Sequence, residues 1–154
     1  MAETDKGMAD LIQQHQAIKA HMGFLTKALE KLTTQSHGEK VKSAQLKEQI
    51  KLYRWSLYDF REAIRRHIEL DEHIFQALLG HVSLEELSKE HEEIRKQIDD
   101  VISQAENAVY NKLSREELNH CANTIRESVK RICQACQAHI AKEDSFLKAE
   151  QGNS

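Results

Sequence analysis

Two segments of the sequence repeat the same pair of potential metal ligands at the same spacing. The first has Asp71 four residues after His67, with a second acid directly behind it. The second has Glu143 four residues after His139, and again a second acid follows. Residues four positions apart on a helix lie on one face, with their Cβ atoms about 5–6 Å apart. Each histidine and its carboxylate could therefore reach a common point, and imidazole nitrogen with carboxylate oxygen suits iron, manganese or zinc.

Two further histidines occupy segments that also resemble each other. His15 and His91 each have a leucine four residues earlier and an isoleucine three residues later. His91 follows His15 by 76 residues, and His139 follows His67 by 72 residues, so the same order of elements occurs twice. Two matching patterns in matching order indicate a duplicated helical hairpin more strongly than one coincidence would.

The elements that must position these residues are four long helices. Apolar residues recur at steps of three and four through four stretches, which is the period of an amphipathic helix, and the candidate ligands lie on these apolar stripes. Gly80 is a predicted C-cap, and Ser83 and Ser114 open predicted capping boxes. The predicted helices cover about residues 5–32, 43–79, 83–110 and 114–149, with a polar loop over 33–38 and a frayed tail over 151–154.

The composition agrees with an all-α fold. The 154 residues include no proline and only five glycines, which argues against a sandwich or barrel with frequent turns. The length fits one domain, and short connections favour antiparallel neighbours. The sequence therefore predicts a single domain over residues 1–154, with its core at about 5–149, folded as an up-down-up-down four-helix bundle.

Charge and hydropathy exclude several classes of partner. The 22 basic and 25 acidic residues leave a formal charge of -3, which gives no electrostatic case for nucleic acid or an anionic membrane surface. No apolar run approaches the length of a membrane span, and the first residues do not form a secretory signal. The three cysteines are too few for a disulfide framework and odd in number, so we expect a cytoplasmic protein.

Six ionisable side chains in the interior of a bundle would need a partner. Burying an isolated carboxylate is energetically costly, and bound cations are the simplest way to neutralise two buried carboxylates. We therefore expect two metal ions bridged by the two carboxylates, with one pair of histidines on each ion. The predicted ligands are His15 and His67 for one ion, His91 and His139 for the other, and Asp71 and Glu143 as bridges.

The order His, then His-x-x-x-carboxylate, then His, then His-x-x-x-Glu resembles the hemerythrin-like family, also called the HHE cation-binding domain. The resemblance covers about residues 11–146. It implies a four-helix bundle with a non-haem di-iron centre, in which these six residues hold two iron ions. Members of that family bind dioxygen, sense oxygen or redox state, store or sense iron, or handle nitric oxide and peroxide. The resemblance therefore implies dioxygen or another small diatomic ligand as the partner, in oxygen or redox sensing or in iron handling.

The sequence departs from the pattern of that family at two positions. Oxygen-carrying hemerythrins have a further histidine one turn before the third-helix ligand, where this chain has Leu87. This leaves one ion with fewer nitrogen ligands and could open a position for water or a small ligand. The second departure is Asp71, where glutamate is usual, so Glu72 is an alternative bridge. By the same logic, Asp144 is an alternative to Glu143.

Other functions remain open from the sequence. The same ligands would serve a di-iron oxidase, peroxidase or nitric-oxide-handling enzyme, although a metal- or oxygen-binding protein is favoured over a dedicated enzyme. A metal-free structural or interaction bundle is the second alternative. Cys133 and Cys136 are expected to be buried packing residues, with a redox role beside the metals as the alternative. His37, in the first predicted loop, is a reserve ligand.

Overall fold

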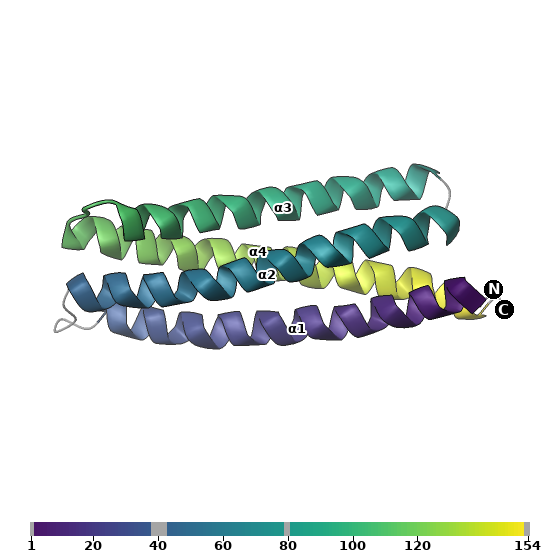
Figure 1. Ribbon diagram of the computed structural model, residues 1–154, viewed down its shortest axis with the longest axis horizontal. Coiled ribbons are helices and arrows are strands. Elements are labelled where there is room, and N and C mark those ends of the chain that lie inside the picture. The colour runs from purple at the N-terminus through teal and green to yellow at the C-terminus, as the bar shows by residue number, and fades with distance from the viewer. Residues whose placement is uncertain (1, 38–42, 79–80, 153–154) are drawn as a thin grey trace.

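The protein folds into four long helices that form an up-down bundle, as predicted. The computed structural model describes residues 2–37, 43–78 and 81–152. Figure 1 shows that successive helices run in opposite directions, so both termini lie at the same end of the bundle. In chain order the helices are α1 (Ala2–His37), α2 (Ser43–Leu78), α3 (His81–Tyr110) and α4 (Arg115–Gly152).

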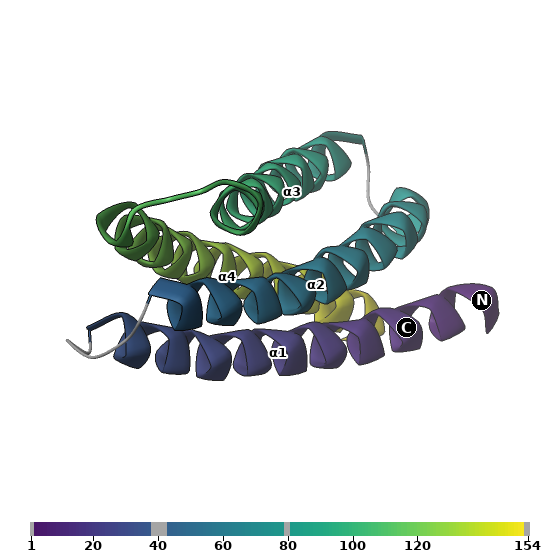
Figure 2. The same ribbon diagram turned by 60° about the vertical axis from the view of Figure 1, so that its left-hand side comes forward.

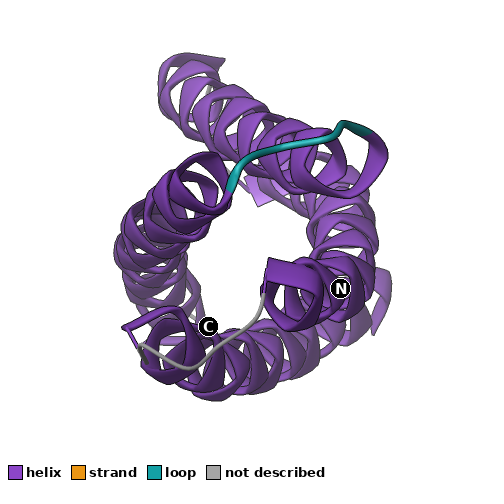
Figure 3. Cartoon of the chain, turned by 90° about the vertical axis from the view of Figure 1, so that its left-hand side faces the viewer, coloured by secondary structure: helices purple, strands orange, loops and turns teal. Residues whose placement is uncertain are grey.

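The helices form a closed ring around a common interior. Each helix packs against the next one in the chain, and α4 returns against α1. In the turned view of Figure 2, α1 and α2 lie side by side, with α3 on the opposite side of the bundle from α1. The end view in Figure 3 shows the helices arranged around the bundle axis. One face of every helix therefore lines the interior, where the sequence pattern places the candidate ligands.

The start of α4 is fixed by the predicted capping box. The Ser114 hydroxyl oxygen accepts a hydrogen bond from the Glu117 backbone N–H at 3.1 Å. In return, the Glu117 carboxylate accepts one from the Ser114 backbone N–H, also at 3.1 Å. These bonds satisfy two donors near a helix start, where the backbone has no intrahelical partners. Hydrogen bonds from the backbone and the side chain of Ser114 to the Glu117 carboxylate lower the pKa of Glu117, because they stabilise its charged form.

Two helices extend further at their C-terminal ends than the sequence predicts. The first was expected to end at Leu32, but α1 continues to His37. The polar residues between them have only a modestly lower helix propensity, and no glycine or proline interrupts the helix there. Likewise, α4 continues to Gly152, so the expected frayed tail is helical at its first two residues.

The turn between α2 and α3 is only partly described. The second helix ends at Leu78, one residue before the predicted limit, and α3 begins at His81, before the predicted capping box. Gly80, the predicted C-cap, lies outside the described residues, and so does the side chain of Ser83. The predicted end of the third helix, at Tyr110, is confirmed.

Two apolar clusters fill the interior on either side of a polar layer. The larger cluster includes Leu32, Phe60 and Ile125 and occupies the part of the bundle away from the termini. The smaller cluster lies toward the end that carries the termini, so the polar layer is displaced from the middle of the bundle toward that end. The smaller cluster consists of Met8, Leu11, Ile74, Phe75, Leu87 and Leu147.

Candidate metal centre

The polar layer contains all six of the residues predicted as ligands. They come from all four helices, and none of them is more than 4 % exposed. Their helical spacing places them on the interior faces together with the apolar stripes, so the helices that bury the core also bury these groups. The six are His15 on α1, His67 and Asp71 on α2, His91 on α3, and His139 and Glu143 on α4.

Glu143 is in contact with three histidines. Its Oε1 lies 3.0 Å from His67 Nε2 and 3.0 Å from His139 Nε2. The same oxygen lies 3.3 Å from His15 Nε2. The carboxylate of Glu143 therefore touches histidines from both halves of the duplicated hairpin.

Asp71 faces the remaining histidine. Its Oδ2 lies 2.6 Å from His91 Nε2, 3.8 Å from His139 Nε2 and 3.9 Å from His67 Nε2. Asp71 is thus also within reach of both histidine pairs. The neighbouring Glu72 has a side chain that is 49 % exposed, so the shorter aspartate is the inward carboxylate on α2.

The distances in this cluster are those of groups that could share a cation. The Nε2 atoms of His91 and His139 are 2.9 Å apart. Two nitrogens bound to one ion at about 2.1 Å and at a right angle would be about 3.0 Å apart. Except for His15, the six residues offer ligand atoms that all lie within 4.8 Å of one another. His15 joins this set through its contact with Glu143.

Two of the histidines are held from outside by carboxylates. His15 donates a hydrogen bond from Nδ1 to Asp144 Oδ1 at 2.7 Å. His139 donates one from Nδ1 to Glu90 Oε2 at 3.0 Å. A histidine that donates its Nδ1 proton outward presents the lone pair of Nε2 inward, which is the form that binds a metal.

The other two histidines also direct Nδ1 toward an oxygen on a neighbouring helix. His67 donates from Nδ1 to the side-chain oxygen of Gln14 at 3.2 Å. His91 Nδ1 faces Glu72 Oε1 at 3.7 Å, beyond hydrogen-bond distance. All four histidines therefore share one orientation, with Nε2 inward and Nδ1 outward.

The residues that face the Nδ1 atoms of the histidines occupy equivalent positions in the two halves of the duplicated sequence. Glu72 and Asp144 each come directly after an inward carboxylate, and the structure places them behind histidines instead of in a bridging position. Gln14 and Glu90 each come directly before a candidate ligand. The ligand pattern in the sequence did not predict a role for these last two residues, although they align in the duplicated halves.

Several buried polar atoms of the cluster have no hydrogen-bond partner among the described residues. They include Oδ1 of Asp71, Oε2 of Glu143 and Nδ1 of His91. Buried polar atoms in proteins are nearly always satisfied, so unsatisfied ones call for an explanation such as an ion. Apart from Nδ1 of His91, which faces outward, these atoms are carboxylate oxygens, and such oxygens are ligands that fit divalent cations.

In the absence of a cation, protons balance the buried carboxylates. Burial raises the pKa of Asp71 more than its histidine neighbours lower it. Burial also acts to raise the pKa of Glu143, but hydrogen bonds from His139, His15 and His67 hold that pKa well below its usual range. Burial lowers the pKa of His139, yet its bonds to Asp71 and Glu143 outweigh this effect and raise the pKa to about 10.

Three other residues singled out from the sequence have packing positions. Leu87, which takes the place of a possible histidine ligand, is 1 % exposed and belongs to the smaller apolar cluster. Cys133 and Cys136 are buried free thiols, and burial raises the pKa of Cys136 to about 12. Both thiols therefore stay protonated at neutral pH, as expected of packing residues.

His37 lies far from the cluster. It is the last residue of α1, about 33 Å beyond His15 along the helix at about 1.5 Å per residue. Its side chain lies outside the described residues. The position of the backbone alone removes His37 as a reserve ligand.

Comparison with known proteins gives no family assignment. The sequence matches no protein-family model, and searches of curated proteins and of solved structures find no significant match. The resemblance to hemerythrin-like proteins thus rests on the ligand pattern of the sequence, and the structure supports a four-helix bundle with a buried cluster that could hold metal. In the described part of the chain, no helix is long and apolar enough to cross a membrane.

Proposed function

We propose that this protein binds two non-haem metal ions, expected to be iron, and that the centre binds dioxygen or a related small ligand such as nitric oxide or peroxide. One observation carries this proposal. Each of the two buried carboxylates, Asp71 and Glu143, lies within reach of histidines from both halves of the duplicated hairpin. A pair of shared carboxylates between two pairs of histidines is the arrangement that two neighbouring cations need.

Two ions account for these donors better than one. Each half of the cluster supplies two imidazoles and shares the two carboxylates. Two histidines with one carboxylate form the facial ligand set of non-haem Fe(II) sites, which leaves further positions open to a ligand. Manganese and zinc accept the same donors, so the identity of the metal is a matter for direct measurement.

An apolar cavity beside the cluster suits a small ligand. It is lined by five isoleucines and Cys136 around the rings of His67, His91 and His139. Its volume of about 10 Å³ is about the space that one water molecule needs. A dry cavity of this size favours a small uncharged molecule over an organic substrate or a hydrated anion.

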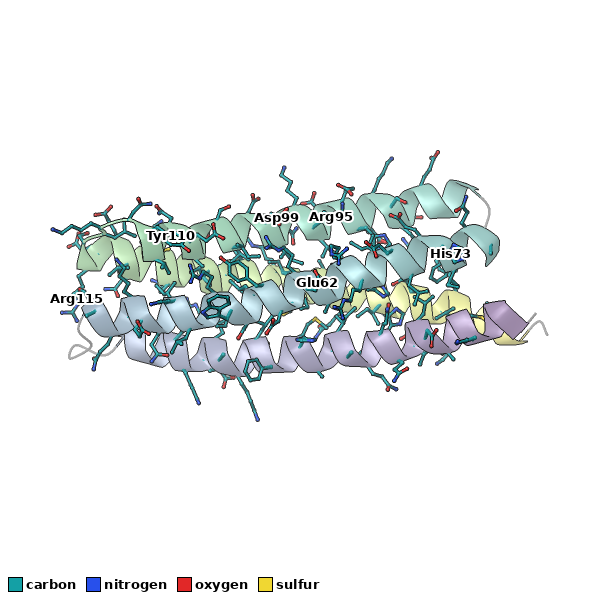
Figure 4. The ribbon with its side chains drawn as sticks, in the orientation of Figure 1. Glu62, His73, Arg95, Asp99, Tyr110 and Arg115 are labelled. Atoms are coloured by element: carbon teal, nitrogen blue, oxygen red, sulfur yellow. The ribbon has the colours of Figure 1, made fainter. Side chains whose placement is uncertain are left out.

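A groove on the surface between α2 and α3 approaches this cavity. The groove has a volume of about 410 Å³ and shares Ile64 and Ile68 with the cavity. Figure 4 labels Glu62, Arg95 and Asp99, which belong to its lining. The lining carries three arginines and three acids, so the groove has no net charge to attract an ion. A neutral diatomic ligand fits this approach.

The chain would prepare the centre in three ways. Hydrogen bonds at Nδ1 hold His15, His67 and His139 with their Nε2 atoms inward. The negative charges of Asp71 and Glu143 offset the positive charge of the ions, and the isoleucines of the cavity limit access of water. When bound, iron would supply reversible electron transfer to the small ligand.

Exposure of the reduced, metal-loaded protein to nitric oxide and, separately, to air tests the ligand. The proposal predicts a stable change in the absorption spectrum that is complete at about one ligand per metal pair. Continued consumption of the ligand would instead support the alternative of an enzyme. If metal-loaded protein shows no spectral response to either gas, small-ligand binding is wrong even though metal binding stands.

A further inference from the structure

Two partly exposed carboxylates accept hydrogen bonds from histidines that are predicted to hold different metal ions. Asp144 accepts from His15, and Glu90 accepts from His139, each from a neighbouring helix. We propose that Asp144 and Glu90 are positioning residues that set the affinities of the two ions separately. Asp144 acts on the ion held by His15 and His67, and Glu90 acts on the other ion. This inference rests on the proposed two-metal function.

The chemistry of the outer hydrogen bond explains how such residues act. A carboxylate that accepts the Nδ1 proton fixes the orientation of the ring and increases the electron density at Nε2. Loss of such an outer partner commonly weakens metal binding about 10- to 100-fold. Asp144 and Glu90 each have a side chain that is 35 % exposed, so replacing either carboxylate by its amide should leave the core intact.

Asp144 and Glu90 lie on different helices and contact different histidines, so each is expected to affect a different ion. Asp144 lies on α4 and reaches α1, whereas Glu90 lies on α3 and reaches α4. Glu90 is also anchored by Lys142, whose Nζ lies 3.4 Å from the Glu90 oxygen that does not face the histidine. Each carboxylate therefore has its own contact with one histidine, and no histidine is shared between them.

The internal duplication supplies a comparison within the same chain. Gln14 occupies, behind His67, the position that Glu90 occupies behind His139. An amide oxygen is a weaker acceptor than a carboxylate, because charge-assisted hydrogen bonds are about twice as strong as neutral ones. Replacing Gln14 by glutamate should therefore increase the affinity for the ion held by His15 and His67. This effect is opposite in direction to that expected for Asp144→Asn.

The test measures Co²⁺ binding to the full-length chain after the native metal has been removed by chelation. Two backgrounds isolate one ion each: His91→Ala retains the ion of His15 and His67, and His15→Ala retains the other. In the His91→Ala background, Asp144→Asn should weaken binding about 10- to 100-fold, while Glu90→Gln should change it less than about 2-fold. In the His15→Ala background, the two effects should be exchanged. Glu93→Gln, at an exposed position on the helix of Glu90, is the matched control and should change neither affinity.

The outcomes separate this inference from the proposed function. Equal effects of Asp144→Asn and Glu90→Gln in both backgrounds, or no effect in either, would overturn separate control while leaving metal binding in place. An increase in affinity on Gln14→Glu in the His91→Ala background would support the inference independently of any loss of stability. Failure of the unmodified chain to bind Co²⁺, Fe²⁺ or Zn²⁺ would instead overturn the proposed function itself.

Discussion

Glu143 has one carboxylate oxygen close to three of the candidate histidine ligands. It is fully buried, and its Oε1 lies 3.0–3.3 Å from the Nε2 atoms of three histidines on three helices. A neutral amide of the same shape could not balance the charge of two cations. If two ions bind as proposed, we therefore expect the carboxylate of Glu143 to be the group on which both depend most.

Glu143→Gln is expected to abolish binding of at least one ion and to weaken the other by at least about 10-fold, because the bridge between them is lost. Metal content after equilibration with Fe²⁺ under anaerobic conditions measures the effect. The matched control is Glu127→Gln, the same substitution at an exposed site on α4, which should retain full metal content. Full metal content in Glu143→Gln would contradict the bridging role.

Metal affinity should rise with pH through the neutral range. The pKa of His139 is raised to about 10 in the metal-free chain, because its bonds to Asp71 and Glu143 outweigh burial. The proton on its Nε2 must leave before that nitrogen can bind a cation. Below about pH 10, binding therefore releases this proton, and the affinity falls as the pH is lowered. Titrations with Co²⁺ at several values between about pH 6 and 8 measure this change, and a pH-independent affinity would contradict it.

The same pKa shift has the opposite effect on the stability of the metal-free fold. A histidine with a raised pKa in the folded state stabilises it fully below the unfolded value of 6.5. This stabilisation is lost as the pH rises from there to about 10. Chemical denaturation of the metal-free protein at several pH values should therefore show the contribution of His139 decreasing in the alkaline direction, and a contribution that grew with pH would argue against the protonated cluster.

At the scale of the helices, the periodic pattern was sufficient to predict the fold and the buried faces. His15 and His91 lie on stripes with leucine and isoleucine, and a helix that buries those residues must bury the histidines too. The ends of the helices were harder to predict, because residues such as those before His37 tolerate either helix or loop. The predicted cap at Ser114 correctly marked the start of α4, whereas α3 begins before the predicted cap at Ser83.

The outer partners depend on contacts between helices, which the sequence does not encode locally. Gln14 faces away from its neighbour His15 and reaches His67 on α2. Glu90 likewise passes over its neighbour His91 and reaches His139 on α4. Which helix such a side chain meets depends on the rotation and spacing of the packed helices. These contacts therefore could be identified only once the bundle was assembled.

The capping box at the start of α4 makes a prediction about stability alone. Ser114→Ala removes the acceptor for the Glu117 N–H and should reduce the free energy of unfolding by about 1 kcal/mol. Urea denaturation measures this difference, and metal content should not change. Ser103→Ala, at an exposed position inside α3, is the control and should change stability by less than about 0.5 kcal/mol. Equal stability of Ser114→Ala and the parent protein would show that the cap contributes nothing.

At the scale of the whole molecule, the candidate metal centre joins all four helices, between the middle of the bundle and the end with the termini. Its donors come from every helix, and the smaller apolar cluster separates it from the end with the termini. A cation bound only by the folded chain stabilises it, by about 2.7 kcal/mol at 100 times its Kd. We therefore expect metal binding and folding to be coupled in this bundle.

Replacing both His67 and His139 by leucine distinguishes a metal protein from a metal-free interaction bundle. If the cluster binds metal, added Fe²⁺ or Zn²⁺ should raise the Tm of the parent protein and leave that of the double variant unchanged. A metal-free bundle predicts no effect of metal on either protein and a higher Tm for the double variant, because apolar groups replace buried polar ones. Differential scanning calorimetry with and without metal measures both quantities.

The most direct test of the two-metal centre is the metal content of the purified full-length protein together with its absorption spectrum. After expression in iron-rich medium, the proposed two-metal centre predicts about two irons per chain. It also predicts charge-transfer absorption that is lost on reduction and restored on exposure to air. Colourless protein that contains no iron and takes up neither Fe²⁺ nor another divalent metal would contradict it.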